Sequence, residues 1–252
     1  MIRSIVLFFM AGVVALSSAL AHAQQRTFRV LALYSTNVEA DHVLFAEQAL
    51  QFFEKAAAKD HFDFKSSTNW DDLNDPSLSR YQVVLWLNAS PATERQRTSF
   101  QRYMEHGGGW LGFHAAGYND ESTHWPWYVD FLGAVFYGNS WPPLPAKLVV
   151  DDNTHLVTKN LPASFTSPAN EWYIWKPDPR ANKDIKVLLT LDPSNYPLGL
   201  KDTIIGGDLP VVWTNTRYKM VYMNMGHGDR IFDNPTQNLL FENTLSWLGG
   251  RN

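Results

Sequence analysis

The stretch Gly107-Gly108-Gly109-Trp110-Leu111-Gly112-Phe113-His114-Ala115-Ala116-Gly117 decides the fold class. Its centre, residues 110–113, is a short apolar run of the kind that forms a buried strand. Small residues flank the polar side chain of His114, as a tight strand-turn-helix requires if that side chain is to stand exposed. The pattern therefore predicts a strand that ends in a sharp turn, with His114 at the carboxyl end of the strand.

Strands and helices alternate ahead of this stretch. Apolar runs predict strands over 28–34, 62–64 and 81–87. Helical spacing predicts one helix that begins with Asp41 as its cap and another that begins at Ser90-Pro91. This alternation is typical of a Rossmann- or flavodoxin-like three-layer α/β sandwich with a mostly parallel central sheet, in which ligands bind at the carboxyl ends of the strands.

The second half of the chain has a different pattern, with short strand candidates separated by many prolines and glycines. These candidates cover 146–150, 171–175, 185–191, 211–214 and 219–225. Asp233-Asn234-Pro235 begins a closing helix that ends at Gly249-Gly250. We find no repeat or linker, so we expect extra β elements within one domain.

The N-terminus has the pattern of a secretory signal peptide. Arg3 precedes an apolar run over 5–20, and Ala21-His22-Ala23 is a small-x-small cleavage site. We expect cleavage after Ala23, a signal peptide over 1–23, and a single domain over 24–252 in the periplasm or outside the cell. No later segment resembles a membrane span, so we expect no membrane partner for the mature protein.

Composition excludes several classes of function. After cleavage the chain has 20 basic and 25 acidic residues, which gives a formal charge of −5. No basic patch suggests a nucleic-acid partner. The chain has no cysteine, which excludes disulfides and a thiol nucleophile. The ten Trp, ten Tyr and fifteen Phe residues belong mainly to a core, although an aromatic patch could also make a homo-oligomer.

Two further polar positions are candidates for chemistry. Glu171 lies in the polar-aromatic string Asn170-Glu171-Trp172-Tyr173-Ile174-Trp175 and could bind sugar hydroxyls or act as a general acid or base. His227, in Gly226-His227-Gly228-Asp229, follows an apolar strand and could face the same crevice as His114. Asp229 is a candidate to orient an imidazole. The alternative for each is an ordinary structural role.

Taken together, four segments resemble the ThuA-like, trehalose-utilisation family. They are Gly-Gly-Gly-Trp-Leu-Gly-Phe-His-Ala-Ala at 107–116, Asn-Glu-Trp-Tyr at 170–173, Pro-Val-Val-Trp at 210–213 and Tyr-Met-Asn-Met-Gly-His-Gly at 222–228. The resemblance implies a class I glutamine amidotransferase-like fold in which His114 replaces the cysteine nucleophile. It also implies a role in the metabolism of trehalose and related sugars.

The resemblance extends to other histidines with less agreement. His42 falls in the first strand-to-helix connection, where the family commonly has a histidine. His155 matches a family position but lacks the proline that usually follows, so we assign it a structural role. The segment 136–141 departs from a family pattern that often includes a histidine, for which His124 is a substitute candidate.

Three functions remain open at this point. The first is a carbohydrate-active enzyme that hydrolyses, eliminates or isomerises a sugar or oxidised sugar, with His114, Glu171 and His227 as catalytic residues. Its substrate-binding residues would be His42, Trp172, Tyr173 and Trp213. The second is a non-catalytic saccharide-binding or accessory protein. The third is a metal-dependent hydrolase, because three histidines and a glutamate could hold a divalent metal, although no compact ligand motif supports it.

Overall fold

Five strands pair in parallel around the stretch 107–117. The computed structural model describes residues 27–195 and 208–251. The parallel strands follow the order β2-β1-β3-β4-β11. Their bounds are β1 Arg29–Leu33, β2 Asp63–Ser67, β3 Val83–Trp86, β4 Gly109–Phe113 and β11 Met220–Met223. Strands β3, β4 and β11 are buried throughout, which explains their nearly continuous apolar sequence.

The second half of the chain extends this sheet with antiparallel strands in the order β11-β10-β9-β6-β7. The bounds are β6 Leu144–Val150, β7 Ser164–Asn170, β9 Ile185–Leu191 and β10 Pro210–Asn215. Strands β5 (Phe136–Asn139) and β8 (Tyr173–Trp175) form a separate two-stranded sheet. The predicted α/β fold with extra β elements is confirmed, and most of these elements join the main sheet.

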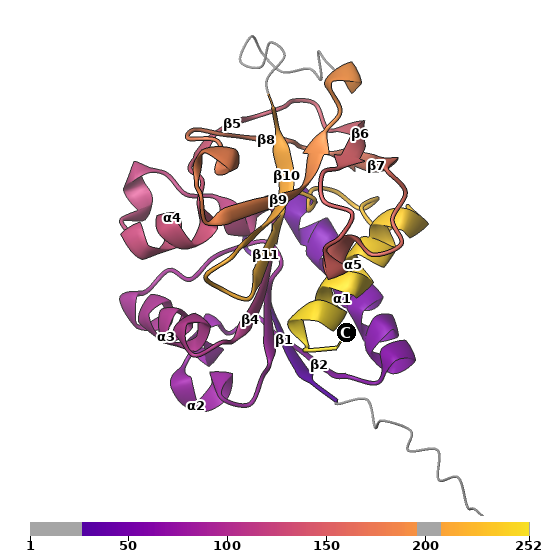
Figure 1. The fold of residues 1–252 in the computed structure, drawn as a ribbon. Helices are drawn as coiled ribbons and strands as arrows, with labels where there is room; N and C mark the ends of the chain where they lie inside the picture. The colour runs from indigo at the N-terminus through magenta and orange to yellow at the C-terminus, as the bar shows by residue number, and fades with distance from the viewer. Residues whose placement is uncertain (1–26, 196–207, 252) are drawn as a thin grey trace, which may run out of the picture.

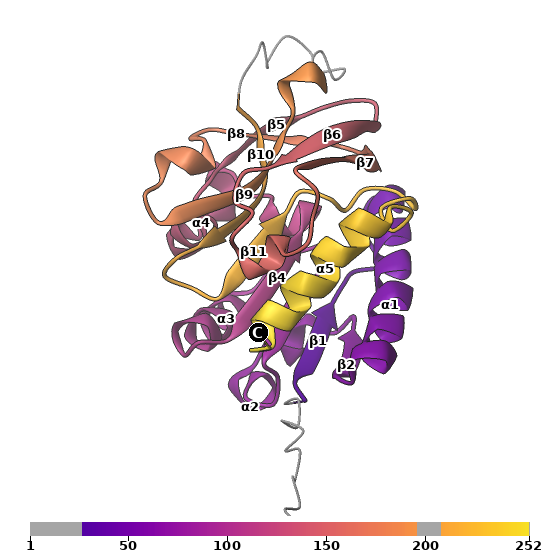
Figure 2. The same ribbon diagram turned by 45° about the vertical axis from the view of Figure 1, so that its right-hand side comes forward.

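Helices cover both faces of the sheet, as Figures 1 and 2 show. On one face lie α1 (Ala40–Asp60) and α5 (Pro235–Leu248); on the other lie α2 (Asp75–Leu78), α3 (Glu94–Glu105) and α4 (Pro126–Leu132). Two buried apolar clusters fill the interfaces. Successive residues of β1 alternate between them, with Val30 in one and Leu31 in the other. The predicted three layers are confirmed.

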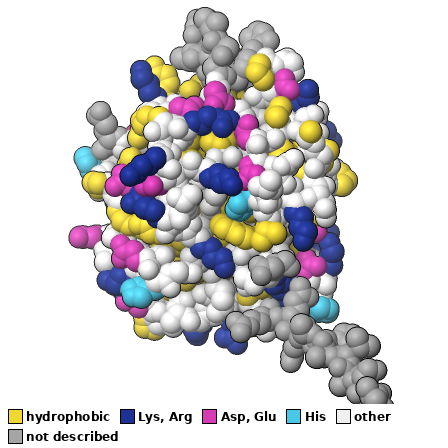
Figure 3. Space-filling model, viewed as in Figure 1, with side chains coloured by type: hydrophobic (Ala, Val, Ile, Leu, Met, Phe, Trp, Pro, Cys, Tyr) yellow, Lys and Arg dark blue, Asp and Glu magenta, His cyan; other side chains and the backbone are white. Residues whose placement is uncertain are grey.

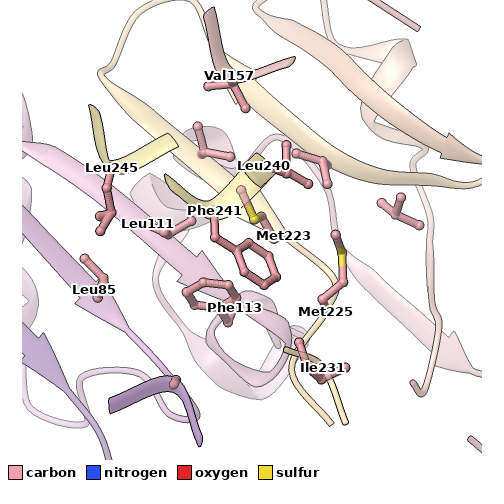
Figure 4. Packing of buried hydrophobic residues seen from close by; sticks show 14 of the residues in the cluster. Leu85, Leu111, Phe113, Val157, Met223, Met225, Ile231, Leu240, Phe241 and Leu245 are labelled. Carbon is pink, nitrogen blue, oxygen red and sulfur yellow. The ribbon is translucent and has the colours of Figure 1, made fainter. Parts of the chain in front are cut away.

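Aromatic packing holds the end of β4 in place. Phe113, its last residue, lies 5.5 Å from Phe241 of α5 and 5.3 Å from Phe45 of α1, measured between ring centroids. Figure 4 shows Phe113 and Phe241 side by side among residues of β11 and α5. Full burial of such a side chain contributes about 1.5–3 kcal/mol. The contacts fix the backbone one residue before His114.

Two helices begin at residues other than those predicted. Helix α1 has Glu39 as its N-cap instead of Asp41, and Asp41 lies in the first turn. Helix α3 begins after Thr93 instead of Ser90, because Thr93 and Gln96 form a reciprocal capping box. The shift at the start of α1 leaves His42 in the first turn of that helix, where the sequence predicts it.

The charge distribution on the surface and the character of the helices concern two predictions, the absence of a nucleic-acid partner and the absence of a membrane partner. Figure 3 shows basic and acidic side chains interspersed over the visible face, without a large area of one sign. Between residues 27 and 251, leaving out 196–207, no helix combines the length and the apolar character that a membrane span needs. The predicted signal peptide over 1–23 lies outside the described residues.

Candidate functional site

Four segments bring polar side chains together at the carboxyl edge of the parallel strands. Strands β4 and β11 run in parallel with Phe113 opposite Met223, so His114 and Asn224 follow at the same level. Helix α1 follows β1 and places His42 at this edge. Glu171 comes from the connection between β7 and β8, because β8 begins only at Tyr173 rather than at the predicted residue 171.

His114 occupies the predicted sharp turn. It is the first residue of the short 3-10 helix η2 (His114–Gly117), and its φ of 38° lies in the left-handed region. Such a conformation in a non-glycine residue costs of order 1–3 kcal/mol and is enriched at functional sites. The Tyr222 hydroxyl donates to the backbone oxygen of His114 at 3.0 Å. The expectation of an exposed side chain is wrong, because His114 is fully buried.

Hydrogen bonds fix the orientation of the His114 ring. Nδ1 lies 2.8 Å from the Asn224 backbone oxygen, closer than the 3.4 Å to the Asn224 side-chain nitrogen. A carbonyl oxygen only accepts, so the ring hydrogen resides on Nδ1. The opposite nitrogen, Nε2, lies 3.3 Å from Oε2 of Glu171. Nε2 and Oε2 therefore form a hydrogen bond when one of the two carries a further proton.

Glu171 is held from two sides. Its Oε1 accepts a hydrogen bond from the side-chain nitrogen of Asn139 in β5, while its Oε2 faces His114. The Glu171 side chain is 12% exposed, whereas that of His114 is 0% exposed. Glu171 thus lies between the buried imidazole and solvent, where a ligand can reach it.

Burial and mutual charge shape the titration of the cluster. Burial lowers the pKa of His114 below its ordinary value, against the opposing effect of Glu171. Burial of Glu171 works to raise its pKa, but the bond to His114 and the neighbouring histidine charges outweigh this and lower it. The pair accommodates one additional positive charge, either a proton or a cation.

Two further histidines contact His114. Ring centroids of His42 and His114 lie 5.2 Å apart, those of His42 and His227 5.1 Å, and those of His114 and His227 5.6 Å. Burial, followed by the charges of His114 and His227, lowers the pKa of His42 to about 4. The three predicted histidines therefore form one cluster with Glu171.

His227 has carboxylates nearby, but not the predicted one. Its Nε2 lies 3.7 Å from Glu39, and its Nδ1 lies 3.7 Å from Asp41. Asp229, the predicted partner, is exposed and takes no part in these pairs. The start of α1 therefore supplies the acidic neighbours of His227.

The three aromatic candidates have different positions. The ring of Tyr173 packs on His114 with a centroid distance of 4.0 Å. Trp172 and Trp213 are instead fully buried, and their indole nitrogens donate to the backbone oxygens of Leu144 and Leu132. Neither ring is available to a ligand, so we remove Trp172 and Trp213 from the predicted substrate-binding set. Both tryptophans belong to the buried core.

Three asparagines at the site escaped the sequence analysis. Asn139 binds Glu171, the Asn224 backbone binds His114, and Asn170 accepts from the backbone nitrogens of Gly226 at 3.0 Å and His227 at 3.1 Å. Asn170 and Asn224 lie within two of the segments that resemble the ThuA-like family, and this position could have marked them as site residues. Nothing in the segment 136–141 marks Asn139, because only the pairing of β5 with β8 brings it to Glu171.

Other candidate residues lie elsewhere. His155 packs on Trp247 at a centroid distance of 4.9 Å, consistent with its structural assignment. His124 follows the 3-10 helix η3 (Glu121–Thr123) and belongs to neither potential metal-ligand group of the cluster. A cavity of about 480 Å³ lies at the opposite, amino edge of the strands, lined by Gln82, Tyr103 and Lys219 among others. It contains none of the clustered residues.

Comparison with known proteins agrees with this architecture. The sequence profile of the ThuA family, described as trehalose utilisation, matches residues 29–248. A ThuA-like protein of Bacteroides uniformis ATCC 8492 is 52% identical over 90% of this chain and 93% of its own, with a TM-score of 0.86. No curated protein matches.

More distant structures share the fold. A ThuA-like protein of Parabacteroides merdae ATCC 43184 is 18% identical over 90% of this chain and 91% of its own, with a TM-score of 0.64. The glutaminase domain of Trypanosoma brucei CTPS is 9% identical over 90% of this chain and 95% of its own, with a TM-score of 0.53. The class I glutamine amidotransferase-like fold is thus confirmed, and by the extent of the profile match the chain belongs to the ThuA family.

Proposed function

We propose that this protein is an exported enzyme that acts on a sugar or an oxidised sugar, with His114 and Glu171 as its reacting groups. The observation that carries the proposal is the buried imidazole 3.3 Å from a partly exposed carboxylate at the carboxyl edge of the sheet. Glutamine hydrolysis by a thiolate is excluded because the chain has no cysteine. Family membership supports a carbohydrate as the substrate class.

The pair is suited to proton transfer. In a 3-keto-glycoside the hydrogen on C2 is acidic, because the neighbouring ketone stabilises the resulting enolate. Glu171 would remove that proton, the electron pair would form the C1–C2 double bond, and the glycosidic oxygen would leave as a hydroxyl with the proton that the Glu171–His114 pair has taken up. Isomerisation or hydrolysis would use the same acid–base capacity. His114 would hold the transferred proton on Nε2, because its Nδ1 hydrogen is bound to the Asn224 backbone oxygen.

Sugar recognition would use rings that the sequence analysis did not select. Trp141 and Tyr137 are each 53% exposed, and both lie two residues from Asn139, the partner of Glu171. An exposed ring presents an apolar face for the C–H groups of a pyranose, while carboxylates and amides bind its hydroxyls. Trp141, Tyr137 and Asn139 would thus take the role first assigned to Trp172 and Trp213.

The second candidate function is a non-catalytic saccharide-binding protein. It is favoured by the loss of the thiol nucleophile that the fold carries in amidotransferases. The third is a metal-dependent hydrolase, which is favoured by buried ring nitrogens of His42 and His227 that have no hydrogen-bond partner among the described residues. Imidazole lone pairs of this kind are ligands for Zn²⁺.

The test is turnover of a panel containing trehalose, other disaccharides and their 3-keto derivatives. We expect product from the unmodified protein and at least a 100-fold loss in His114→Ala and Glu171→Gln. Matched controls are His106→Ala and Glu105→Gln, two exposed residues of the α3 region. Binding without product across the panel would favour the accessory function, and equal activity in all four variants would refute the assigned residues.

A further inference from the structure

We propose that His42, His114 and Glu171 bind one divalent transition-metal ion at the carboxyl edge of the sheet. The proposal concerns the site of the proposed function but does not depend on any sugar chemistry. It rests on a separate observation, namely that ligand atoms of His42, His114 and Glu171 lie within 4.8 Å of one another and that Nε2 of His42 is buried without a hydrogen-bond partner among the described residues.

The spacing of the donor atoms fits a single ion. One ligand atom from each of His42, His114 and Glu171 lies within 4.8 Å of the others. Bonds of about 2.0–2.1 Å in a tetrahedral zinc site place neighbouring ligand atoms about 3.3 Å apart. Nε2 of His114 and Oε2 of Glu171 already lie 3.3 Å apart. Small side-chain rotations of His42 would complete the set.

Unpartnered nitrogens provide independent support. Nε2 of His42, one of the proposed ligands, is buried without a hydrogen-bond partner among the described residues; both ring nitrogens of His227 are also unpartnered, but His227 belongs to the competing ligand set described below. Leaving a buried polar atom unsatisfied costs about 1–3 kcal/mol, so a set of such atoms requires an explanation. A cation bound by His42, His114 and Glu171 supplies one for Nε2 of His42.

Outer hydrogen bonds are already in place for two of the proposed ligands. Metal-binding histidines usually donate their second ring N–H to a carbonyl or carboxylate, and ligating carboxylates are themselves hydrogen-bonded. Nδ1 of His114 donates to the Asn224 backbone oxygen at 2.8 Å, which leaves Nε2 free for the ion. Asn139 binds the other oxygen of Glu171. These bonds orient the lone pairs before any ion arrives.

The donor chemistry selects the class of metal. Two imidazoles and one carboxylate suit Zn²⁺, Fe²⁺ or Mn²⁺ better than Ca²⁺, which prefers oxygen ligands throughout. Three protein ligands leave at least one coordination position open, as in catalytic rather than structural zinc sites. A bound cation would occupy the place of the proton shared by His114 and Glu171, and would polarise a substrate oxygen there.

A competing ligand set shares His42. Glu39, His42 and His227 also bring their donor atoms within 4.8 Å of one another. Glu39 is the weaker ligand candidate, because its side chain is 56% exposed and lies 3.7 Å from His227. The matched substitutions Glu171→Gln and Glu39→Gln separate the two sets, since each removes one carboxylate and preserves the side-chain shape.

The experiment is titration of tag-free, chelator-treated protein with Zn²⁺ by isothermal calorimetry, without sugar. We expect one saturable site. We expect His42→Gln and Glu171→Gln to weaken binding at least 100-fold, Asn139→Ala to weaken it about 10- to 100-fold, and Glu39→Gln and the surface control His106→Gln to change it less than threefold. Thermal unfolding of each chelated variant checks that it folds.

X-ray absorption at the zinc edge of the unmodified protein gives a second measurement that needs no variant. We expect nitrogen and oxygen neighbours, including the scattering pattern of two imidazoles. Absence of saturable binding, a spectrum without imidazole, or loss of binding in Glu39→Gln but not in Glu171→Gln would each overturn the proposal. Metal binding without sugar turnover would contradict only the proposed function, whereas sugar turnover by a protein that shows no saturable metal binding would contradict only the metal site.

Discussion

Gly226 tests whether the backbone after β11 sets the position of His114. Its φ is 153°, and a Cβ built on it would lie 2.5 Å from Cβ of His114. Carbon atoms in contact lie about 3.5–4.0 Å apart, so Gly226→Ala must displace His114 by roughly 1 Å. The matched control is Gly228, which also has a positive φ, 84°, but where an added Cβ would meet no atom of a non-adjacent residue within 4 Å.

The expected magnitudes follow from these two environments. An alanine in the left-handed region costs about 1–2 kcal/mol, which we expect for Gly228→Ala. Gly226→Ala adds an overpacking cost of about 1–3 kcal/mol, so we expect a total of about 2–5 kcal/mol. A 1 Å displacement of a reacting group can cost about 100-fold in rate. We expect that loss only in Gly226→Ala.

Urea unfolding of the two variants measures the stability difference, and Zn²⁺ titration together with sugar turnover measures the displacement of His114. The folded fraction of each variant is measured first, so that unfolding is not mistaken for a loss of site function. Equal stability and equal site function in the two alanine variants would refute the view that Gly226 is required for the approach to His114.

Three further predictions concern the site entrance, the titration of the cluster and the core. Trp141→Ala should weaken saccharide binding with little change in the midpoint of thermal unfolding; unchanged sugar affinity would contradict its assigned role. The pKa of His42, about 4 in the folded protein against 6.5 in the unfolded chain, means that the unfolded state binds more protons between these values. The free energy of unfolding of chelator-treated protein should therefore fall as pH decreases from 6.5 towards 4. The variant His42→Gln should show a smaller change over this pH range, which urea unfolding at several pH values measures. Phe241→Ala should cost about 3–5 kcal/mol, because the fully buried ring packs on Phe113; a cost below 1 kcal/mol in urea would show that α5 does not hold the end of β4.

The sequence predicts the parallel half of the fold well for a physical reason. Strands covered on both faces need nearly continuous apolar residues, and the runs at β3 and β4 stand out for that reason. Strands β5 (Phe-Tyr-Gly-Asn) and β7 (Ser-Phe-Thr-Ser-Pro-Ala-Asn) have neither a continuous apolar run nor a regular alternation, and the prediction omits both. Their identity depends on pairing with β8 and β6, which lie elsewhere in the sequence.

The candidate site is predictable where residues follow strands directly. His114 and His227 come after β4 and β11, and parallel pairing of those strands brings them together. The sequence does not distinguish core rings from pocket rings, as Trp172 and Trp213 demonstrate. It also does not reveal Asn139, whose contact with Glu171 arises from the small β5–β8 sheet.

The central claim is that sugar binds where His114 and Glu171 meet, and a crystal structure of the protein soaked separately with trehalose and with a 3-keto-glucoside tests it most directly. We predict a sugar oxygen within hydrogen-bond distance of Glu171 and near Nε2 of His114. Sugar bound instead in the cavity beside Tyr103 and Lys219, at the opposite edge of the sheet, would contradict the claim.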